Sequence, residues 1–313
     1  MAALLALVQS SAWAQAYPVK PVRMVVPFAA GGVVDNTARL LAPKAAEALG
    51  QPLVIENRPG AGGNIAADAV AKSAADGYTV LITTHGHAIS PSLYKSLPFD
   101  AERDFAPVTQ IASSFLVLVS APQVAGSVQE LLAAARARPG RLNYGSTGLG
   151  APPHLVGELF RQTTGIDVVH VPYKGDAPMY QALLAREVDF AFGPLGNAIQ
   201  HIRSGKLRAL GMTGARRAAA IAEVPTMVEA GVPGFELAGW LGVFAPAGTP
   251  RPAIDRLQAA MALAIAHPDV RERFPALGYE PVGGTPQEFG AQFKRDLALY
   301  ARVIREARIP LQD

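Results

Sequence analysis

The sequence predicts an α/β protein with two lobes, each built from a mostly parallel sheet and covering helices. The chain of 313 residues has the length of about two ordinary domains. Short apolar strand patterns alternate with helical patterns along almost all of it, which is typical of parallel sheets covered by helices. A glycine-rich turn joins a strand to a helix in each half, and this repetition favours two lobes of similar construction.

Composition excludes several classes of protein. Half of the residues are hydrophobic and 17% are charged, with 28 Lys and Arg against 25 Asp and Glu. Disorder needs low hydrophobicity and high net charge, so a folded chain is expected. The basic residues are scattered, without the interleaved aromatic residues of a single-strand binder, so we expect no nucleic-acid partner. Zero cysteines exclude disulfides, thiol catalysis and Cys-ligated zinc.

The first 16 residues resemble an export signal. They form an uncharged apolar run that ends in Ala14-Gln15-Ala16, which has the A-x-A form of a cleavage site. We therefore expect a signal peptide over 1–16, cleaved after Ala16, and a periplasmic protein. A buried first helix is the alternative interpretation. No later apolar stretch reaches the roughly 20 residues that span a membrane.

The first lobe opens with a β-loop-α unit. Residues 23–28 form a strand pattern, Ala29-Ala30-Gly31-Gly32 form the turn, and Asp35 lies at the start of a helix. The β-α-β order that continues from there implies a parallel sheet with right-handed crossovers. The further elements expected are strands at 53–56 and 78–83, the glycine-rich loop 57–64 and a helix at 65–73.

The second lobe repeats this pattern. A strand at 115–119 precedes a helix with the capping box Ser127 to Glu130. The strand 142–144 then runs into Gly145-Ser146-Thr147-Gly148-Leu149-Gly150 and a helix that begins at Pro152. The remaining expected elements are strands at 168–171, 188–192, 207–212 and 240–245, and helices ending at His267 and near Arg308. We place lobe 1 at 17–119 plus 230–313 and lobe 2 at 120–229.

The two glycine-rich turns are the strongest candidates for a binding site. Each one lies between a strand and a helix and contains no acid or base, so each presents backbone N–H groups at the positive end of a helix. Two such turns that face each other across a cleft suit a small acid. The alternative is that each glycine only supplies a turn conformation.

Two segments resemble nucleotide-binding and hydrolase motifs, but the spacing of their residues does not match either motif. Gly60 to Ile65 lacks the third glycine of a dinucleotide fingerprint, and Gly145-Ser146-Thr147-Gly148 misses the G-x-S-x-G elbow by one residue. His85-Gly86-His87 follows a strand, and this pair would bind a metal only if a carboxylate joined it from elsewhere. We expect one or both of these histidines to line a ligand cleft as donors, with plain surface packing as the alternative, and we expect no metal site.

Seven sequence blocks, which span the chain after residue 16 in order, resemble the Bug (TctC-like) family, the extracytoplasmic solute receptors of tripartite tricarboxylate transporters. The blocks are Pro27 to Arg39, Glu56 to Asn64, Asp76 to Thr79, His87 to Tyr94, Val171 to Gly175, Gly205 to Leu210 and Phe244 to Pro250.

The resemblance implies a type II periplasmic-binding-protein fold, a Venus flytrap of two Rossmann-like lobes joined by two crossing segments. It also implies no enzyme activity and no cofactor, a membrane permease as partner, and a small carboxylate as ligand: a di- or tricarboxylate, an acidic amino acid or an aromatic carboxylate. We expect a monomer. The ligand-binding residues that it implies are Phe28, Ala29, Ala30, Gly31, Gly32, Asp35, Thr84, His85, His87, Gly145, Ser146, Thr147 and Gly148.

Three positions depart from the usual family pattern and bear on the ligand. Gly150-Ala151 replaces Gly-Ser, Asp176 replaces a small neutral residue, and Gly193-Pro194 replaces a frequent acidic position. Two other functions stay open. One is an enzyme acting on a small carboxylic acid, with His85 or His87 as base beside Ser146 or Thr147. The other is a ligand-sensing receptor for signalling.

Overall fold

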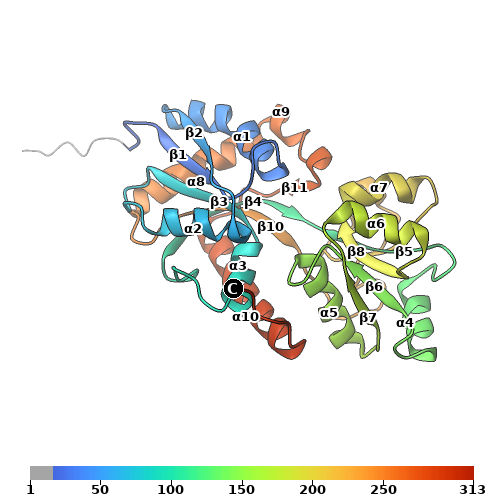
Figure 1. Cartoon of the computed structure of the whole chain (residues 1–313). Coiled ribbons are helices and arrows are strands. Elements are labelled where there is room, and N and C mark those ends of the chain that lie inside the picture. The colour runs from blue at the N-terminus through green and yellow to red at the C-terminus, as the bar shows by residue number, and fades with distance from the viewer. Residues whose placement is uncertain (1–16) are drawn as a thin grey trace, which may run out of the picture.

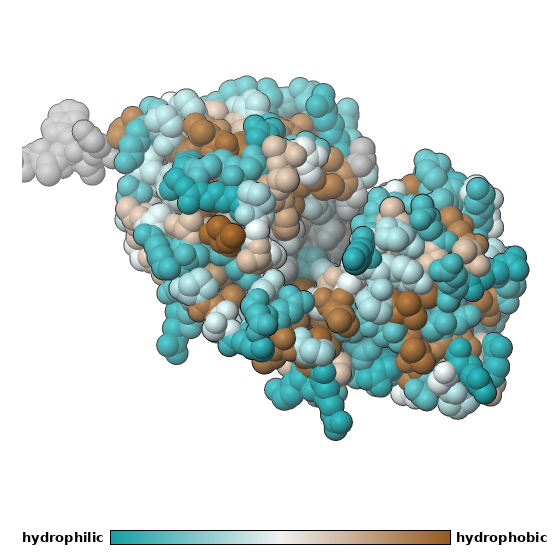
Figure 2. All heavy atoms as spheres, in the orientation of Figure 1, coloured by the Kyte–Doolittle hydropathy of each residue, from teal (hydrophilic) through white to brown (hydrophobic). Residues whose placement is uncertain are grey.

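The computed structural model describes residues 17–313 as two α/β lobes (Figure 1), and the space-filling view shows a hollow between them (Figure 2). The expected signal peptide, 1–16, lies outside the described residues. The two-lobed fold confirms the α/β prediction. Within the described part of the chain, no helix is both long and apolar enough to cross a membrane.

Lobe 1 is organised by a six-stranded sheet in the order β11-β4-β10-β3-β1-β2. The three strands from the start of the chain pair in parallel, whereas β10, β4 and β11 pair antiparallel to their neighbours. The sheet therefore combines a β-α-β core with strands that arrive from later in the chain. Its strands are β1 (Val22–Val26), β2 (Leu53–Asn57), β3 (Thr79–Thr84), β4 (Phe105–Ser114), β10 (Gly239–Pro246) and β11 (Tyr279–Pro281).

Helices cover both faces of this sheet (Figure 1). They are α1 (Val33–Leu49), α2 (Asn64–Ala71), α3 (Gly86–Leu93), α8 (Arg251–Ala266), α9 (Pro268–Arg271) and α10 (Pro286–Glu306). The long helix α10 begins at a capping box in which Thr285 and Glu288 each accept from the other's backbone N–H. Short 3₁₀ turns at Ala61–Gly63 and Pro275–Leu277 complete the lobe.

Lobe 2 contains a five-stranded sheet in the order β7-β6-β8-β5-β9. Strands β7, β6 and β8 are parallel, and β5 is antiparallel to both of its neighbours. The strands are β5 (Leu116–Ser120), β6 (Asn143–Ser146), β7 (Val169–Pro172), β8 (Phe190–Pro194) and β9 (Arg208–Met212). The helices are α4 (Val128–Ala137), α5 (Pro152–Thr164), α6 (Asp176–Ala185) and α7 (Leu195–Arg203), with a 3₁₀ turn at Ala219–Ile221.

Both crossings lie at other positions than the sequence predicted. Strand β5 pairs with β8 and β9, so lobe 2 begins near Leu116, not at 120. At the other end, Phe235 packs on Phe160 and Phe192 of lobe 2, and the chain returns to lobe 1 only at β10. The predicted boundaries of 119/120 and 229/230 are therefore corrected to about 115 and 238, because strand pairing and core packing assign these segments to lobe 2.

Candidate ligand-binding cleft

A cavity of about 460 Å³ lies between the two lobes, within the range of roughly 300–1,000 Å³ that is usual for small-molecule sites. The hollow is visible between the lobes in Figure 2. Lobe 1 contributes Val33, Thr84, His85, Ser114, Leu277, Gly278 and Tyr279; lobe 2 and the first crossing contribute Phe115, Leu116, Thr147, Pro152, Pro153, Asp176, Pro194, Gly196 and Asn197.

Strand direction explains why these residues meet. The carboxyl ends of parallel strands share one edge of a sheet, and ligands of open α/β sheets bind outside that edge. Val33 follows β1 and Thr84 ends β3 in lobe 1. Thr147 follows β6, and the first turns of α6 and α7 follow β7 and β8 in lobe 2.

Helix N-termini give the cleft its electrostatic character. Helices α1, α3, α6 and α7 each begin at or beside a residue that lines the cavity. Each N-terminus carries partial positive charge and free N–H groups, which favour an anion. Among the described residues that line the cavity there is no Lys or Arg, and Asp176 is the one side chain with a formal charge at neutral pH. The cleft can therefore attract an anion through backbone dipoles alone.

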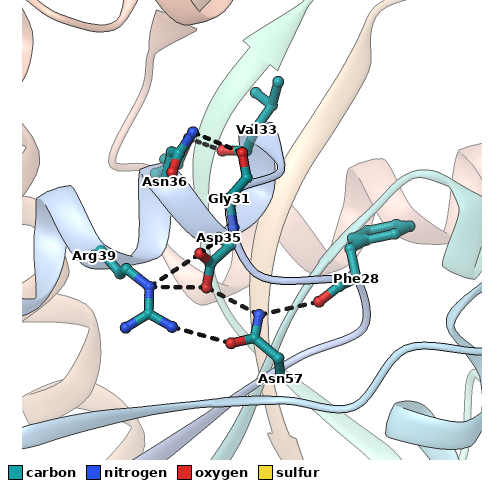
Figure 3. Close-up of polar contacts among 8 residues, drawn as sticks. Phe28, Gly31, Val33, Asp35, Asn36, Arg39 and Asn57 are labelled. Carbon is teal, nitrogen blue, oxygen red and sulfur yellow. Dashed lines mark hydrogen bonds and ion pairs between the residues drawn. The ribbon is translucent and has the colours of Figure 1, made fainter.

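The carboxylate of Asp35 holds the first glycine-rich turn in place through hydrogen bonds (Figure 3). Asp35 accepts hydrogen bonds from the Gly31 backbone N–H at 2.8 Å, from Arg39 Nε at 2.9 Å and from Asn57 Nδ2 at 2.9 Å. Asn57 also donates to the Phe28 carbonyl at 3.0 Å. The Arg39 guanidinium, with the other donors, lowers the pKa of Asp35 to about 2. The ionised carboxylate therefore ties the turn to α1 and β2.

Asp35, expected to bind the ligand, instead supports the turn. Its side chain is buried, with 1% of the residue exposed, and every bond it makes holds the turn. None of the five turn residues Phe28, Ala29, Ala30, Gly31 and Gly32 is among those that line the cavity; the next residue, Val33, lines it instead. Helix α1 has Gly32 as its N-cap, so Asp35 braces the turn from the first helical turn.

The predicted ligand-binding residues Thr84, His85 and His87 follow one another at the end of β3. The first two line the cleft and the third lies in the core. Thr84 and His85 line the cavity, and His85 packs against Trp240 and Tyr300. Burial lowers the pKa of His85 to about 4, so its ring is neutral at neutral pH. Its Nδ1 has no hydrogen-bond partner within the described chain. This nitrogen is buried beside Gly239, so His85 lines the cavity through other parts of its residue.

His87 is a core residue, and its expected place in the cleft is wrong. Its ring lies 4.6–5.8 Å from the rings of Phe99, Phe105, Phe244 and Phe293, and 4% of the residue is exposed. Burial lowers its pKa to about 3. Across residues 17–313 no group of three His, Asp or Glu is placed to hold a metal ion. The surface packing expected as the alternative does not describe His87 either, because its ring lies in the core.

The second glycine-rich turn is held by two stacked histidines. Ser146 Oγ shares a 2.6 Å hydrogen bond with His170 Nε2, and the His170 ring lies 3.9 Å from that of His154. His154 Nδ1 accepts the Gly150 backbone N–H at 3.0 Å. Burial, with His154 as its neighbour, lowers the pKa of His170 to about 4, and burial also lowers that of His154. Neutral imidazoles therefore fix both ends of this turn.

Of the second turn, Thr147 alone lines the cavity. Ser146 is fully buried, and its hydroxyl bonds within lobe 2, which corrects its expected contact with ligand. Gly145 is buried against Met179 and Val188, and Gly148 is likewise not among the lining residues. The helix that follows begins with Pro152 and Pro153, which have no N–H to offer an anion.

The sequence did not single out several residues that the structure brings to the cleft. Sequence patterns single out Asp176 only as a departure from the family pattern and do not point to Asn197 or Tyr279. Asn197 Nδ2 donates to Asp176 Oδ2 at 3.1 Å, which joins the first turns of α6 and α7. The strand-end rule would have found both residues if the two short helices had been predicted.

Two further hollows adjoin this region. An apolar recess of about 210 Å³ shares Phe115, Gly196, Gly278 and Tyr279 with the cleft. A groove of about 480 Å³ near the crossings is lined by Arg216, Arg295 and Asp296, among others, and contains none of the expected site residues. The recess extends the cleft with apolar surface, and the groove meets the cleft at Phe115.

The chain matches the model of the tripartite tricarboxylate transporter family receptor over residues 37–309. The protein belongs to this receptor family. It is similar to the periplasmic binding protein BugD, with 34% identity and a TM-score of 0.73 over 95% of this chain and 100% of that one. These findings confirm the resemblance to the Bug family and its two-lobed binding-protein fold.

Two solved structures of similar proteins contain carboxylates. An R. palustris protein with adipate is 38% identical, with a TM-score of 0.76, over 95% of this chain and 100% of that one. MatC from Rhodopseudomonas palustris, with bound malate, is 33% identical, with a TM-score of 0.72, over 92% of this chain and 100% of that one. Both ligands are small dicarboxylates.

Proposed function

We propose that this receptor captures a small carboxylate in the periplasm and delivers it to the membrane permease of a tripartite tricarboxylate transporter. The observation that carries the proposal is the interlobe cleft, in which helix N-termini supply the positive potential and none of the described lining residues is Lys or Arg. The adipate and malate of the similar proteins support the ligand class. BugD, named as periplasmic, and the expected signal peptide support the location.

The protein acts by binding and not by catalysis. A nucleophile needs a base within reach and a third group that orients the base. The nearest approach to this arrangement is Ser146 with His170, and it is buried in lobe 2 and braces a turn. Ser146 therefore shares no site with His85 or His87. Thr147 lines the cavity together with His85, but His85 Nδ1 has no hydrogen-bond partner in the described chain, so no third group orients this histidine as a base.

A thermal-shift screen over mono-, di- and tricarboxylates, amino acids and the matching neutral amides tests the proposal. Ligand at 100 times its Kd stabilises the bound state by about 2.7 kcal/mol, and at this chain length the melting temperature should rise by roughly 2 °C or more. Scattering with the best ligand should show a smaller radius of gyration, because the lobes close on it. A response only to the neutral amides would refute the carboxylate proposal.

A further inference from the structure

Asp176 gives the cleft one negative charge and no cation to balance it. It is partly buried and lines the cavity, and no Lys or Arg nitrogen of the described chain lies within 4.0 Å of its carboxylate. His85, which also lines the cavity, is neutral at neutral pH. A second carboxylate placed beside Asp176 would be repelled in a partly desolvated site, where salt screens poorly.

The structure also holds the Asp176 carboxylate in position. Asp176 is the first residue of α6, after Gly175 with φ 105°, and Asn197 donates to its Oδ2. Its Oδ1 has no hydrogen-bond donor among the described residues. Burial raises the pKa of Asp176, and the hydrogen bond from Asn197 opposes this shift only in part. The free oxygen is therefore a ready acceptor on the lobe 2 side of the cleft.

Asp176 also changes what the helix N-termini can do. An acid in the first turn of α6 already interacts favourably with the positive end of that helix. The N-termini of α1 and α3, beside Val33 and Thr84 in lobe 1, have no such acid exposed to the cavity, because Asp35 is turned inward. An anionic group of the ligand is thus favoured on the lobe 1 side, away from Asp176.

We propose that the ligand is a zwitterion, a carboxylate that also carries an ammonium group, and that Asp176 binds the ammonium through Oδ1. This inference rests on the proposed function and narrows its ligand class. Asn197 is then a positioning residue, since its amide fixes the carboxylate that receives the cation. Closure of the lobes buries the pair, with the ligand carboxylate facing lobe 1.

The test compares ligands of matched length that differ only at one end. Calorimetry measures the Kd of succinate against 3-aminopropanoate, glutarate against 4-aminobutanoate, and adipate against 5-aminopentanoate. We expect at least one amino compound to bind the wild type about tenfold or more tightly than its dicarboxylate partner, because removing one member of a desolvated charge pair costs at least that factor.

The Asp176→Asn variant should reverse this order. It keeps the shape and removes the charge, so the amino compound should lose about tenfold or more while the dicarboxylate gains. Asp176→Ser is a second neutral variant in case the amide disturbs the bond with Asn197. Glu187→Gln is the matched control: it removes the same charge from an exposed position of lobe 2 and should leave both affinities unchanged.

The outcomes separate this inference from the proposed function. Dicarboxylates that bind as tightly as amino compounds, with no change in either neutral variant, would overturn the zwitterion while leaving a carboxylate receptor in place. A protein that binds none of the six compounds, and no other carboxylate of the screen, would overturn both. Unfolding midpoints near that of the wild type are required of each variant.

Discussion

The two glycine-rich turns occupy equivalent places in the two lobes but are held by opposite chemistry. In lobe 1 the turn at Gly31 is bonded to an ionised carboxylate, that of Asp35, with Arg39 as its counter-ion. In lobe 2 the turn between Ser146 and Gly150 is bonded to two neutral imidazoles. Two turns with similar sequence patterns are therefore stabilised by different kinds of hydrogen-bond partner.

The difference shows how a cleft for an anion can avoid cationic side chains. Arg39, which is positively charged, forms an ion pair with Asp35 next to the first turn. Burial keeps His154 and His170, which support the second turn, uncharged at neutral pH. Both supports leave the surface facing the ligand to backbone dipoles, to neutral polar side chains such as Thr147, and to Asp176. The two turns should then respond differently to pH, to mutation and to salt.

Acidification should have the largest effect. His85, His87 and His170 have pKa values of about 4, 3 and 4 in the folded protein, against an ordinary 6.5. The unfolded chain therefore takes up protons first, and stability that is complete above pH 6.5 is lost as the pH falls toward 4 and 3. The support at Asp35 holds until the pH falls below 3.8 toward 2. Urea midpoints measured at steps of pH check this order.

The variant His87→Phe measures how much one buried imidazole contributes to the loss of stability on acidification. The variant should be as stable as the wild type at neutral pH, since the ring lies among four phenylalanines and its Nε2 has no partner in the described structure. It should lose less stability on acidification. A wild-type midpoint that stays constant down to pH 4 would contradict the neutral-histidine account.

Asp35→Ala should have the next largest effect. It removes three hydrogen bonds to a charged group, and we expect a loss of about 2–4 kcal/mol in the free energy of unfolding. Ligand affinity should fall as well, because the Gly31 turn loses its support. Glu47→Ala, in an exposed ion pair at the other end of α1, should cost about 0–1 kcal/mol. Equal losses in the two variants would refute the bracing role.

Ser146→Ala and Thr147→Ala should separate support from binding in the second turn. The first removes a buried hydroxyl bonded to His170, so stability should fall by about 1–3 kcal/mol. The second removes a hydroxyl that lines the cavity; it should leave stability within about 0.5 kcal/mol and weaken binding by about 1.5–3 kcal/mol if that hydroxyl bonds a charged oxygen.

Thr163→Ala, at an exposed position of α5, is the control for losing a hydroxyl and should alter neither quantity. The reverse pattern, with affinity lost in Ser146→Ala and stability lost in Thr147→Ala, would exchange the roles assigned to the two hydroxyls.

Sequence patterns predicted the parallel strands and both turns because apolar runs bounded by glycine are local signals. They did not predict β4, where Pro107 and the polar pair Thr109 and Gln110 interrupt the apolar pattern. The sheet to which β5 belongs depends on pairing with β8 and β9, far along the chain, so the first crossing was misplaced.

The site was predictable to the level of its turns but not of its side chains. His87 lies in the core because Phe99, Phe105 and two phenylalanines beyond residue 240 surround it, and no local pattern contains that information. The inward direction of Asp35 and Ser146 likewise follows from partners 22 and 24 residues away. Thr84, His85 and Thr147 were named from sequence and do line the cavity.

Salt should have the smallest effect and tests where Arg39 acts. If backbone dipoles bind the ligand carboxylate at short range, affinity should change by no more than about twofold between about 20 mM and 200 mM salt, because buried contacts are poorly screened. Arg39 is half exposed, so it could reach a ligand only by leaving Asp35 and Asn57. Titration calorimetry at both salt concentrations measures this. A hundredfold loss of affinity at the higher concentration, abolished by Arg39→Gln, would show that the arginine beneath the first turn binds the anion directly, and the two turns would then differ in how they bind as well as in how they are held.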